Sequence, residues 1–247
     1  MVIVANWKAY VEDLAKAKKL FAMSKRLAAA TGSRIVLAPP APLLGALAIR
    51  NKSAVAFAAQ DVSATLGGAH TGEITAQAYA TAGATYAVIG HSERREAGDT
   101  DAVIAEKLAH ALAQGLTPIL CIGERGRDGE GRYLGIVREE LTRAIESLAP
   151  KDRAKIIVAY EPLWAIGGDA EHAIGQNDLT EMALYIRKVL AELLPGKSSQ
   201  HSLVLYGGSV EPGNIRDLAA SSGVDGFLIG HATADPRTFS LLVRQLQ

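Results

Sequence analysis

The chain has 247 residues, of which 49% are hydrophobic, and its 26 basic side chains balance 26 acidic ones. Without a basic surplus, we expect neither nucleic acid nor an anionic membrane surface as a partner. No apolar run is long enough to span a membrane, and the N-terminus has neither the basic start nor the long apolar stretch of a signal peptide. The single cysteine excludes an internal disulfide, so the sequence predicts a cytoplasmic protein.

Short apolar segments recur along the chain, and each is followed by a segment with helical periodicity. The nearly continuous apolar character of the short segments predicts strands that are buried on both faces, as in a parallel sheet. The predicted strands cover residues 2–7, 34–39, 55–60, 86–91, 117–122, 155–160, 202–207 and 224–230.

Between the strands, apolar residues recur at i, i+3 and i+4, which predicts amphipathic helices over residues 15–30 and 100–115. The segment 177–196 is expected to begin at an Asn-Asp cap and to end at its Pro-Gly pair. The last segment, 235–247, opens with an aspartate cap and a proline in the first turn, which is a common start of a helix.

Eight strands, each followed by a helix, are typical of a (β/α)8 barrel in a chain of this length. An open, doubly wound sheet is the alternative, but no G-x-G-x-x-G sequence follows the first strand. No linker or low-complexity stretch divides the chain. We therefore predict an α/β fold in which residues 1–247 form a single (β/α)8 barrel domain with eight parallel strands.

In such a barrel, the chemistry takes place where strands end and the loops to the next helix begin. Polar residues and glycines crowd at these predicted ends, beside strands that are otherwise apolar. Taken singly, each has an ordinary structural explanation, such as a surface lysine, a hydrogen-bonded histidine or a packed cysteine. The residues at the strand ends are Asn6, Lys8, Gln60, His91, Glu93, Cys121, Glu124, Glu161, Ser209, Gly230 and His231.

As a set, these residues indicate a more specific chemistry. Glycines after the seventh and eighth strands allow backbone N–H groups to converge on a phosphate, as barrels often do there. Lys8, His91 and Glu161 would face one another beside that phosphate. A cation, a hydrogen-bond donor and a base are what proton abstraction next to a carbonyl requires.

Several motifs, in this order and at these spacings, resemble the triosephosphate isomerase family along nearly the whole chain. They are ANWK (5–8), AAQDVS (58–63), GAHTGE (68–73), VIGHSERR (88–95), LCIGE (120–124), AYEPLWAIG (159–167) and LYGGSV (205–210). The resemblance implies a TIM barrel and an aldose–ketose isomerase that interconverts glyceraldehyde 3-phosphate and dihydroxyacetone phosphate. It implies no metal and no organic cofactor.

The resemblance also implies catalytic roles, which follow the known chemistry of this family. Glu161 is expected to be the base that moves a proton between adjacent carbons, while neutral His91 hydrogen-bonds the substrate oxygens as an enediolate forms. Lys8 would stabilise the negative charge, and Asn6 would orient the substrate. Glu93 matches a family carboxylate beside this site.

For the phosphate, Gly167, Ser209 and Gly230 match family positions whose backbone N–H groups bind this group. The family usually has a second glycine after Gly230, whereas this chain has His231. After NWK the family usually has Met-Asn, whereas this chain has Ala9-Tyr10. We expect His231 to contact the substrate and to add bulk at the phosphate, and charge when it is protonated.

The GAHTGE motif at residues 68–73 resembles the family loop that inserts into a neighbouring subunit, which implies a homodimer. Two departures leave other functions open, because His231 and the longer lid, residues 168–178, would suit an isomerase of a related sugar phosphate such as a tetrulose phosphate. A barrel that binds a phosphorylated ligand without turning it over is a further alternative. The intact set of Lys8, His91 and Glu161 argues against that alternative, because a binding protein has no use for a base.

Overall fold

The computed structural model describes residues 1–166, 173–196 and 198–247. Within these residues, eight parallel strands pair in sequence order, and the last pairs with the first, which closes the sheet into a barrel. The strands are β1 (Val2–Asn6), β2 (Arg34–Ala38), β3 (Ala56–Ala59), β4 (Tyr86–Ile89), β5 (Thr117–Ile122), β6 (Ile157–Tyr160), β7 (Val204–Tyr206) and β8 (Gly226–Ile229).

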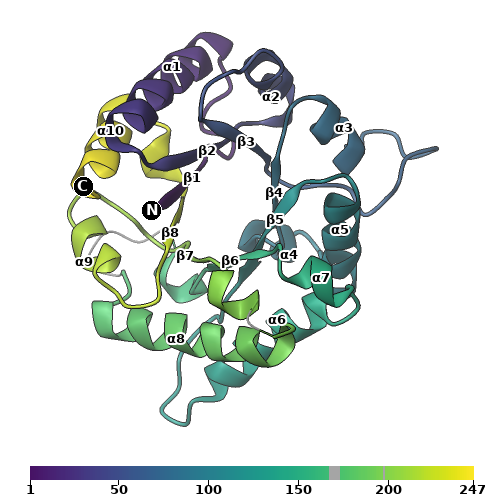
Figure 1. Cartoon of the computed structure of the whole chain (residues 1–247), viewed down its shortest axis with the longest axis vertical. Helices are drawn as coiled ribbons and strands as arrows, with labels where there is room; N and C mark the ends of the chain where they lie inside the picture. Colours follow the sequence, from purple (N-terminus) through teal and green to yellow (C-terminus); the bar gives the residue numbers. More distant parts are fainter. Residues whose placement is uncertain (167–172, 197) are drawn as a thin grey trace.

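Helices form a ring around the barrel (Figure 1). The α-helices are α1 (Leu14–Thr31), α2 (Ala41–Ala48), α3 (Ala76–Thr81), α4 (Ser92–Glu96), α5 (Asp101–Ala113), α6 (Arg132–Ile145), α7 (Pro150–Arg153), α8 (Gln176–Leu193), α9 (Ile215–Ala219) and α10 (Pro236–Gln245). Short 3-10 turns follow β6 and β8 and precede β7, namely η1 (Leu163–Ala165), η4 (His231–Thr233) and η3 (Ser198–His201). The predicted (β/α)8 barrel is confirmed.

The helix starts agree with the sequence in one case and differ in another. Asp235 caps α10 as predicted, because its side chain accepts a hydrogen bond from the backbone N–H of Thr238. The predicted Asn-Asp cap of α8 is wrong, since Gly175 occupies the cap position and Asp178 lies inside the first turn. A carboxylate in the first turn is still favourable there, because it faces the positive end of the helix dipole.

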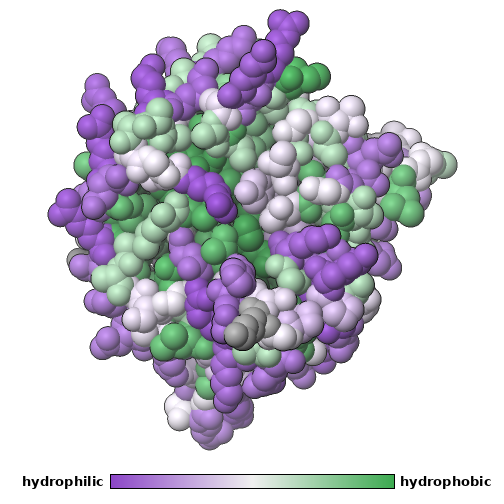
Figure 2. All heavy atoms as spheres, in the orientation of Figure 1, coloured by the Kyte–Doolittle hydropathy of each residue, from purple (hydrophilic) through white to green (hydrophobic). Residues whose placement is uncertain are grey.

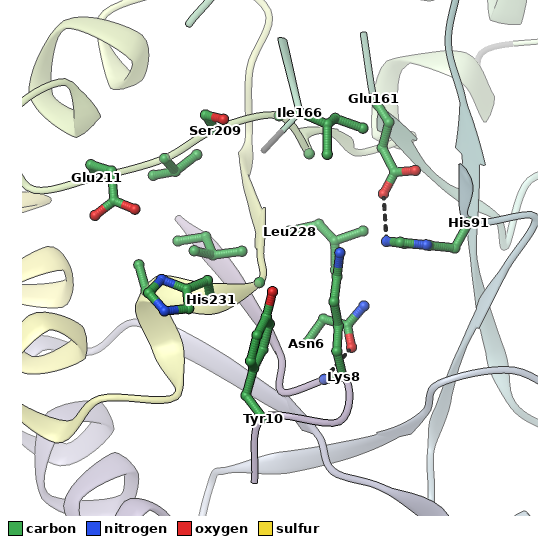
Figure 3. Close-up of a pocket in the computed structure, with 16 residues that line it drawn as sticks. Asn6, Lys8, Tyr10, His91, Glu161, Ile166, Ser209, Glu211, Leu228 and His231 are labelled. Carbon is green, nitrogen blue, oxygen red and sulfur yellow. Dashed lines mark hydrogen bonds and ion pairs between the residues drawn. The ribbon is translucent and has the colours of Figure 1, made fainter. Parts of the chain in front are cut away.

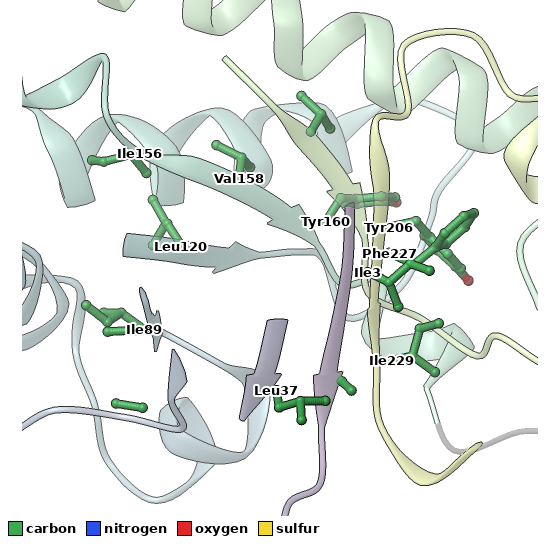
Figure 4. Close-up of a cluster of buried hydrophobic side chains, with 14 of the residues drawn as sticks. Ile3, Leu37, Ile89, Leu120, Ile156, Val158, Tyr160, Tyr206, Phe227 and Ile229 are labelled. Atoms are coloured by element: carbon green, nitrogen blue, oxygen red, sulfur yellow. The ribbon is translucent and has the colours of Figure 1, made fainter. Parts of the chain in front are cut away.

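Strand side chains alternate between two buried layers. Val2 and Val4 of β1 belong to a cluster that fills the interior of the barrel. Ile3 and Ala5, which alternate with them, belong to a second cluster between the strands and the helices (Figure 4). This double burial explains why the strands read as continuous apolar runs, as parallel strands covered on both faces do.

The inward series of side chains becomes polar at the carboxyl ends of the strands. In β6, Ile157 and Ala159 point into the barrel, and Glu161 is the next residue of the same parity. In β1, Asn6 follows the inward residues by the same rule. Because side chains alternate with a period of two, the sequence places these polar groups over the interior of the barrel.

Hydrophobic residues lie toward the middle of the face shown in Figure 2, and hydrophilic residues surround them. The N-terminus lies inside the ring of helices, beside the strands that close the barrel (Figure 1). No helix in the described part of the chain has both the length and the hydropathy to cross a membrane.

The closure between β8 and β1 gives a test of the fold. A methyl group at Gly226 would overlap the carbonyl oxygen of Val2, whereas one at Gly126 would meet no atom within 4 Å. We expect Gly226→Ala to lower the free energy of unfolding by about 3 kcal/mol, because the paired backbones must move apart. Urea unfolding measures this loss, with Gly126→Ala as the control. Equal stabilities of the two variants would contradict it.

Candidate active site

A pocket of about 240 Å³ opens at the carboxyl ends of the strands. It collects side chains from the loops after β1, β4, β6, β7 and β8, which are far apart in the sequence (Figure 3). The predicted site residues that line it are Asn6, Lys8, His91, Glu161, Ser209, Gly230 and His231. The predicted phosphate-binding residue Gly167 lies outside the described residues.

Lys8 reaches the pocket from an unusual backbone conformation. Its φ angle is 43°, and it is the only described residue other than glycine with a positive φ. Such a conformation costs about 1 kcal/mol or more, so surrounding contacts must hold it. The N–H of Lys8 donates to Oδ1 of Asn6 at 3.1 Å, and Nε2 of Gln60 donates to the carbonyl oxygen of Lys8 at 3.0 Å. The turn closes with a bond from the Tyr10 N–H to the Trp7 carbonyl oxygen at 2.9 Å.

The Lys8 ammonium also forms an ion pair with Glu93, with 2.7 Å between Nζ and Oε1. Glu93 does not line the pocket itself, but its contact fixes the cation that does. Partial burial alone would raise the pKa of the Glu93 carboxyl, and the hydrogen bond and charge of Lys8 outweigh this and hold the pKa below its usual value. The family-matched carboxylate therefore holds the lysine in place.

His91 presents a defined ring nitrogen to the pocket. It caps the short helix α4, and its Nδ1 accepts a hydrogen bond from the N–H of Glu93 at 3.2 Å. An accepting Nδ1 carries no proton, so in the neutral ring the proton sits on Nε2. That nitrogen lies 3.5 Å from Oε1 of Glu161 (Figure 3). The arrangement gives an uncharged imidazole that can donate into the pocket.

Glu161 is a buried carboxylate, with only 2% of its surface exposed. Its Oε2 accepts a hydrogen bond from the N–H of Ser92 at 3.2 Å, at the start of α4. The sequence reasoning missed Ser92, although its position directly after His91 at a helix start was a usable signal. One oxygen of Glu161 is thus held by a backbone donor, while the other faces the imidazole.

Cys121 lies beside Glu161 inside the barrel and stays neutral. Burial raises the pKa of its thiol well above the usual value, and the charge of Glu161 raises that pKa further. A protonated thiol adds no second negative charge next to the carboxylate. The structure therefore supports the packing role that the sequence suggested for Cys121.

The segment that follows Glu161 is anchored by Glu124, which is fully buried. Its Oε1 accepts hydrogen bonds from the Tyr160 hydroxyl at 2.8 Å and from the indole N–H of Trp164 at 2.9 Å. Arg127 completes the cluster, with 3.4 Å between its Nε and the same oxygen. Glu124 is thus a salt-bridge partner of Arg127, and it also fixes the residues on both sides of Glu161.

The opposite end of the pocket is formed by Ser209, Gly230 and His231. The N–H of Ser209 donates to the carbonyl oxygen of Ala165 at 3.1 Å in this conformation. Two further polar side chains line this end, Tyr10 and Glu211, and the sequence reasoning gave neither of them a role. Tyr10 was visible only as a departure from the family pattern after NWK.

Together, these contacts define what the pocket can do. A buried carboxylate and a neutral N–H donor lie 3.5 Å apart, and a lysine ammonium enters the same space. Such a set can take a proton from a carbon while it stabilises the charge that develops on the neighbouring oxygen. The glycine-rich end after β7 and β8 is suited to an anion.

Comparison with known proteins shows the family of this chain. The sequence model of a family described as triosephosphate isomerase matches residues 1–246. A triosephosphate isomerase from Thermus thermophilus is 37% identical, over 99% of this chain and 98% of its own length. Those from Coprinopsis cinerea and Herpetosiphon aurantiacus are each 36% identical, over 96% and 98% of this chain and 94% and 98% of their own lengths.

The ion pair of Lys8 gives a direct test of the site's electrostatics. We expect Lys8→Met to change the pKa of Glu93 from lowered to raised, because burial then acts without the opposing ammonium. NMR titration of the Glu93 carboxyl measures the change, and Lys155→Met, which removes a remote ion pair with Asp152, is the control. A Glu93 pKa that stays below its usual value would contradict the role of Lys8.

Proposed function

Because this chain belongs to the triosephosphate isomerase family, we propose that it interconverts glyceraldehyde 3-phosphate and dihydroxyacetone phosphate, a step of glycolysis and gluconeogenesis. The observation that carries the proposal is the pairing of the buried Glu161 carboxylate with His91 Nε2 at 3.5 Å, in a pocket that Lys8 also enters. A coupled assay with glyceraldehyde 3-phosphate as substrate tests it.

In the proposed reaction, Glu161 takes a proton from the carbon next to the carbonyl. The electrons of the broken C–H bond form a carbon–carbon double bond, and the carbonyl π electrons move to oxygen. The Nε2–H of His91 donates to the resulting enediolate, and the ammonium of Lys8 stabilises its charge. Glu161 then returns the proton to the former carbonyl carbon. The hydroxyl on the other carbon gives up its proton and becomes the new carbonyl, and the former carbonyl oxygen gains a proton through Nε2 of His91, so the reaction needs no external oxidant or base.

Asn6 and the far end of the pocket bind and orient the substrate in this proposal. Asn6 lies next to Lys8 and accepts a hydrogen bond from its N–H. Ser209 and Gly230 stand after β7 and β8, where barrels commonly bind phosphate through backbone N–H groups. The Ser209 N–H would have to exchange its bond to Ala165 for one to phosphate.

The two alternatives make different predictions in the same assay. An isomerase of a tetrulose phosphate would show a higher kcat/KM with that substrate than with glyceraldehyde 3-phosphate. A barrel that only binds its ligand would show no turnover of either. The contact of His91 Nδ1 with the Glu93 N–H and that of Nε2 with Glu161 favour an enzyme over a binding protein, because neither contact helps to bind a phosphate.

We expect Glu161→Gln to lower kcat by about 10²–10⁴-fold, because the amide cannot accept the proton. Circular dichroism checks that the variant is folded. Glu139→Gln is the matched control, since Glu139 lies on the exposed surface of α6 and should leave kcat unchanged. Near-normal turnover of Glu161→Gln would remove this residue from the role of base.

We further propose a homodimer in which the loop 68–73 enters a neighbouring subunit. This loop lies between β3 and α3 and extends away from the barrel (Figure 1), and the adjacent Leu66 is 74% exposed. A second, more open cavity lies beside the active site and is lined by Lys8, Gln60 and Glu93, which gives such a loop a place to bind. Exposed apolar residues on a projecting loop are typical of a protein interface.

We expect Thr71→Asp to weaken both self-association and activity, because the new charge would be buried at the interface without a partner. Sedimentation velocity at low micromolar concentration measures the association, and the coupled assay measures the activity. Gln114→Asp, at an exposed position after α5, is the control. A fully active wild-type monomer at that concentration would rule out the dimer as a requirement.

We also propose that the enzyme acts in the cytoplasm. The support is Cys121, the only cysteine of the chain, which is buried and free. A chain without a disulfide gains nothing from an oxidising compartment, and a reducing one preserves the thiol beside Glu161.

A further inference from the structure

Two residues that depart from the family pattern contact each other in the pocket. The rings of Tyr10 and His231 pack edge to face, with centroids 5.1 Å apart and planes at 78°. They are far apart in the sequence but adjacent in space, because β1 pairs with β8 and the loops after these strands lie side by side. Both residues line the active-site pocket.

Hydrogen bonds of its backbone fix Tyr10 in place, and its hydroxyl points into the pocket. Its N–H closes the turn that contains Lys8, and its carbonyl oxygen accepts a hydrogen bond from Lys16 at 3.3 Å. Tyr10 is 51% exposed, yet Figure 3 shows its hydroxyl pointing into the pocket, between His231 and Lys8. No hydrogen bond from this hydroxyl occurs among the described residues, so it is available to a ligand.

His231 is the first residue after Gly230 and begins the turn η4. Its ring lies between Tyr10 and the side of the pocket that carries Glu211 (Figure 3). Within the described residues, neither His231 nor Glu211 takes part in an ion pair. The imidazole is therefore positioned by the Tyr10 ring, and its nitrogens are not occupied by another side chain.

We propose that Tyr10 and His231 bind the substrate's phosphate with their side chains, through the phenol O–H and an imidazole N–H. This inference rests on the proposed function, because it assumes that a phosphorylated substrate occupies the pocket. The pair would supplement the backbone N–H groups of this end of the barrel. Hydrogen bonds from side chains to an anion are directional. The contact between the Tyr10 and His231 rings orients both donors and so should increase the affinity for phosphate.

The decisive variant is Tyr10→Phe, which removes the hydroxyl but keeps the ring that packs on His231. We expect the Kd for inorganic phosphate and the KM for glyceraldehyde 3-phosphate to rise about tenfold, as the loss of one hydrogen bond to a charged group predicts, while kcat changes less than about twofold. Calorimetry measures the Kd. Tyr185→Phe, at a half-buried position of α8 where the hydroxyl contacts Arg138, is the matched control.

His231→Gly should weaken phosphate binding in the same way, and the double variant should lose less than the product of the two single losses, since the two side chains support each other. A phosphate Kd within twofold of the wild type in Tyr10→Phe would overturn the proposal. If that variant weakens phosphate binding but the wild type does not turn over a triose phosphate, the anion site stands and the proposed function fails.

Discussion

The alternation of side chains along closed, doubly buried strands is the constraint on which the site depends. A shift of one residue in any strand would exchange the residues that fill the barrel with those that face the helices. Asn6 and Glu161 continue the inward series of β1 and β6. The strand register that packs the interior therefore also places the polar side chains at the carboxyl-terminal end of the barrel. The packing of the interior and the placement of the polar side chains therefore depend on the same strand register.

A buried carboxylate is costly unless its surroundings compensate it. Glu161 receives the N–H of Ser92 at one oxygen and faces the imidazole of His91 at the other. The neighbouring thiol of Cys121 stays protonated and adds no repulsion. The negative charge of Glu161 is therefore stabilised by neutral donors. The ammonium of Lys8, in contrast, forms its ion pair with Glu93 and not with Glu161. This separation keeps the carboxylate free to accept a proton instead of locking it in an ion pair.

The barrel could be predicted from the sequence because apolar runs and helical periodicity repeat eight times, and the helix-capping aspartate of α10 is a local signal. Once the strands were predicted, their carboxyl ends identified most of the polar residues of the pocket. Other features depend on contacts that no local pattern encodes. The hydrogen bond from Ser92 to Glu161 joins residues 69 positions apart, and the cap of α8 depends on how Gly175 enters the helix.

The pocket has two ends with different chemistry, and one turn connects them. His91 and Glu161, after β4 and β6, form the end that handles protons, whereas Ser209 and Gly230, after β7 and β8, form the end suited to an anion. Lys8 and Tyr10 share the turn after β1, which the hydrogen bond from the Tyr10 N–H to the Trp7 carbonyl oxygen closes around the strained backbone of the lysine. Binding of a phosphate at Tyr10 would hold that turn in place. The unreactive end of a substrate would then be bound beside the turn that carries the charge needed at the reactive end.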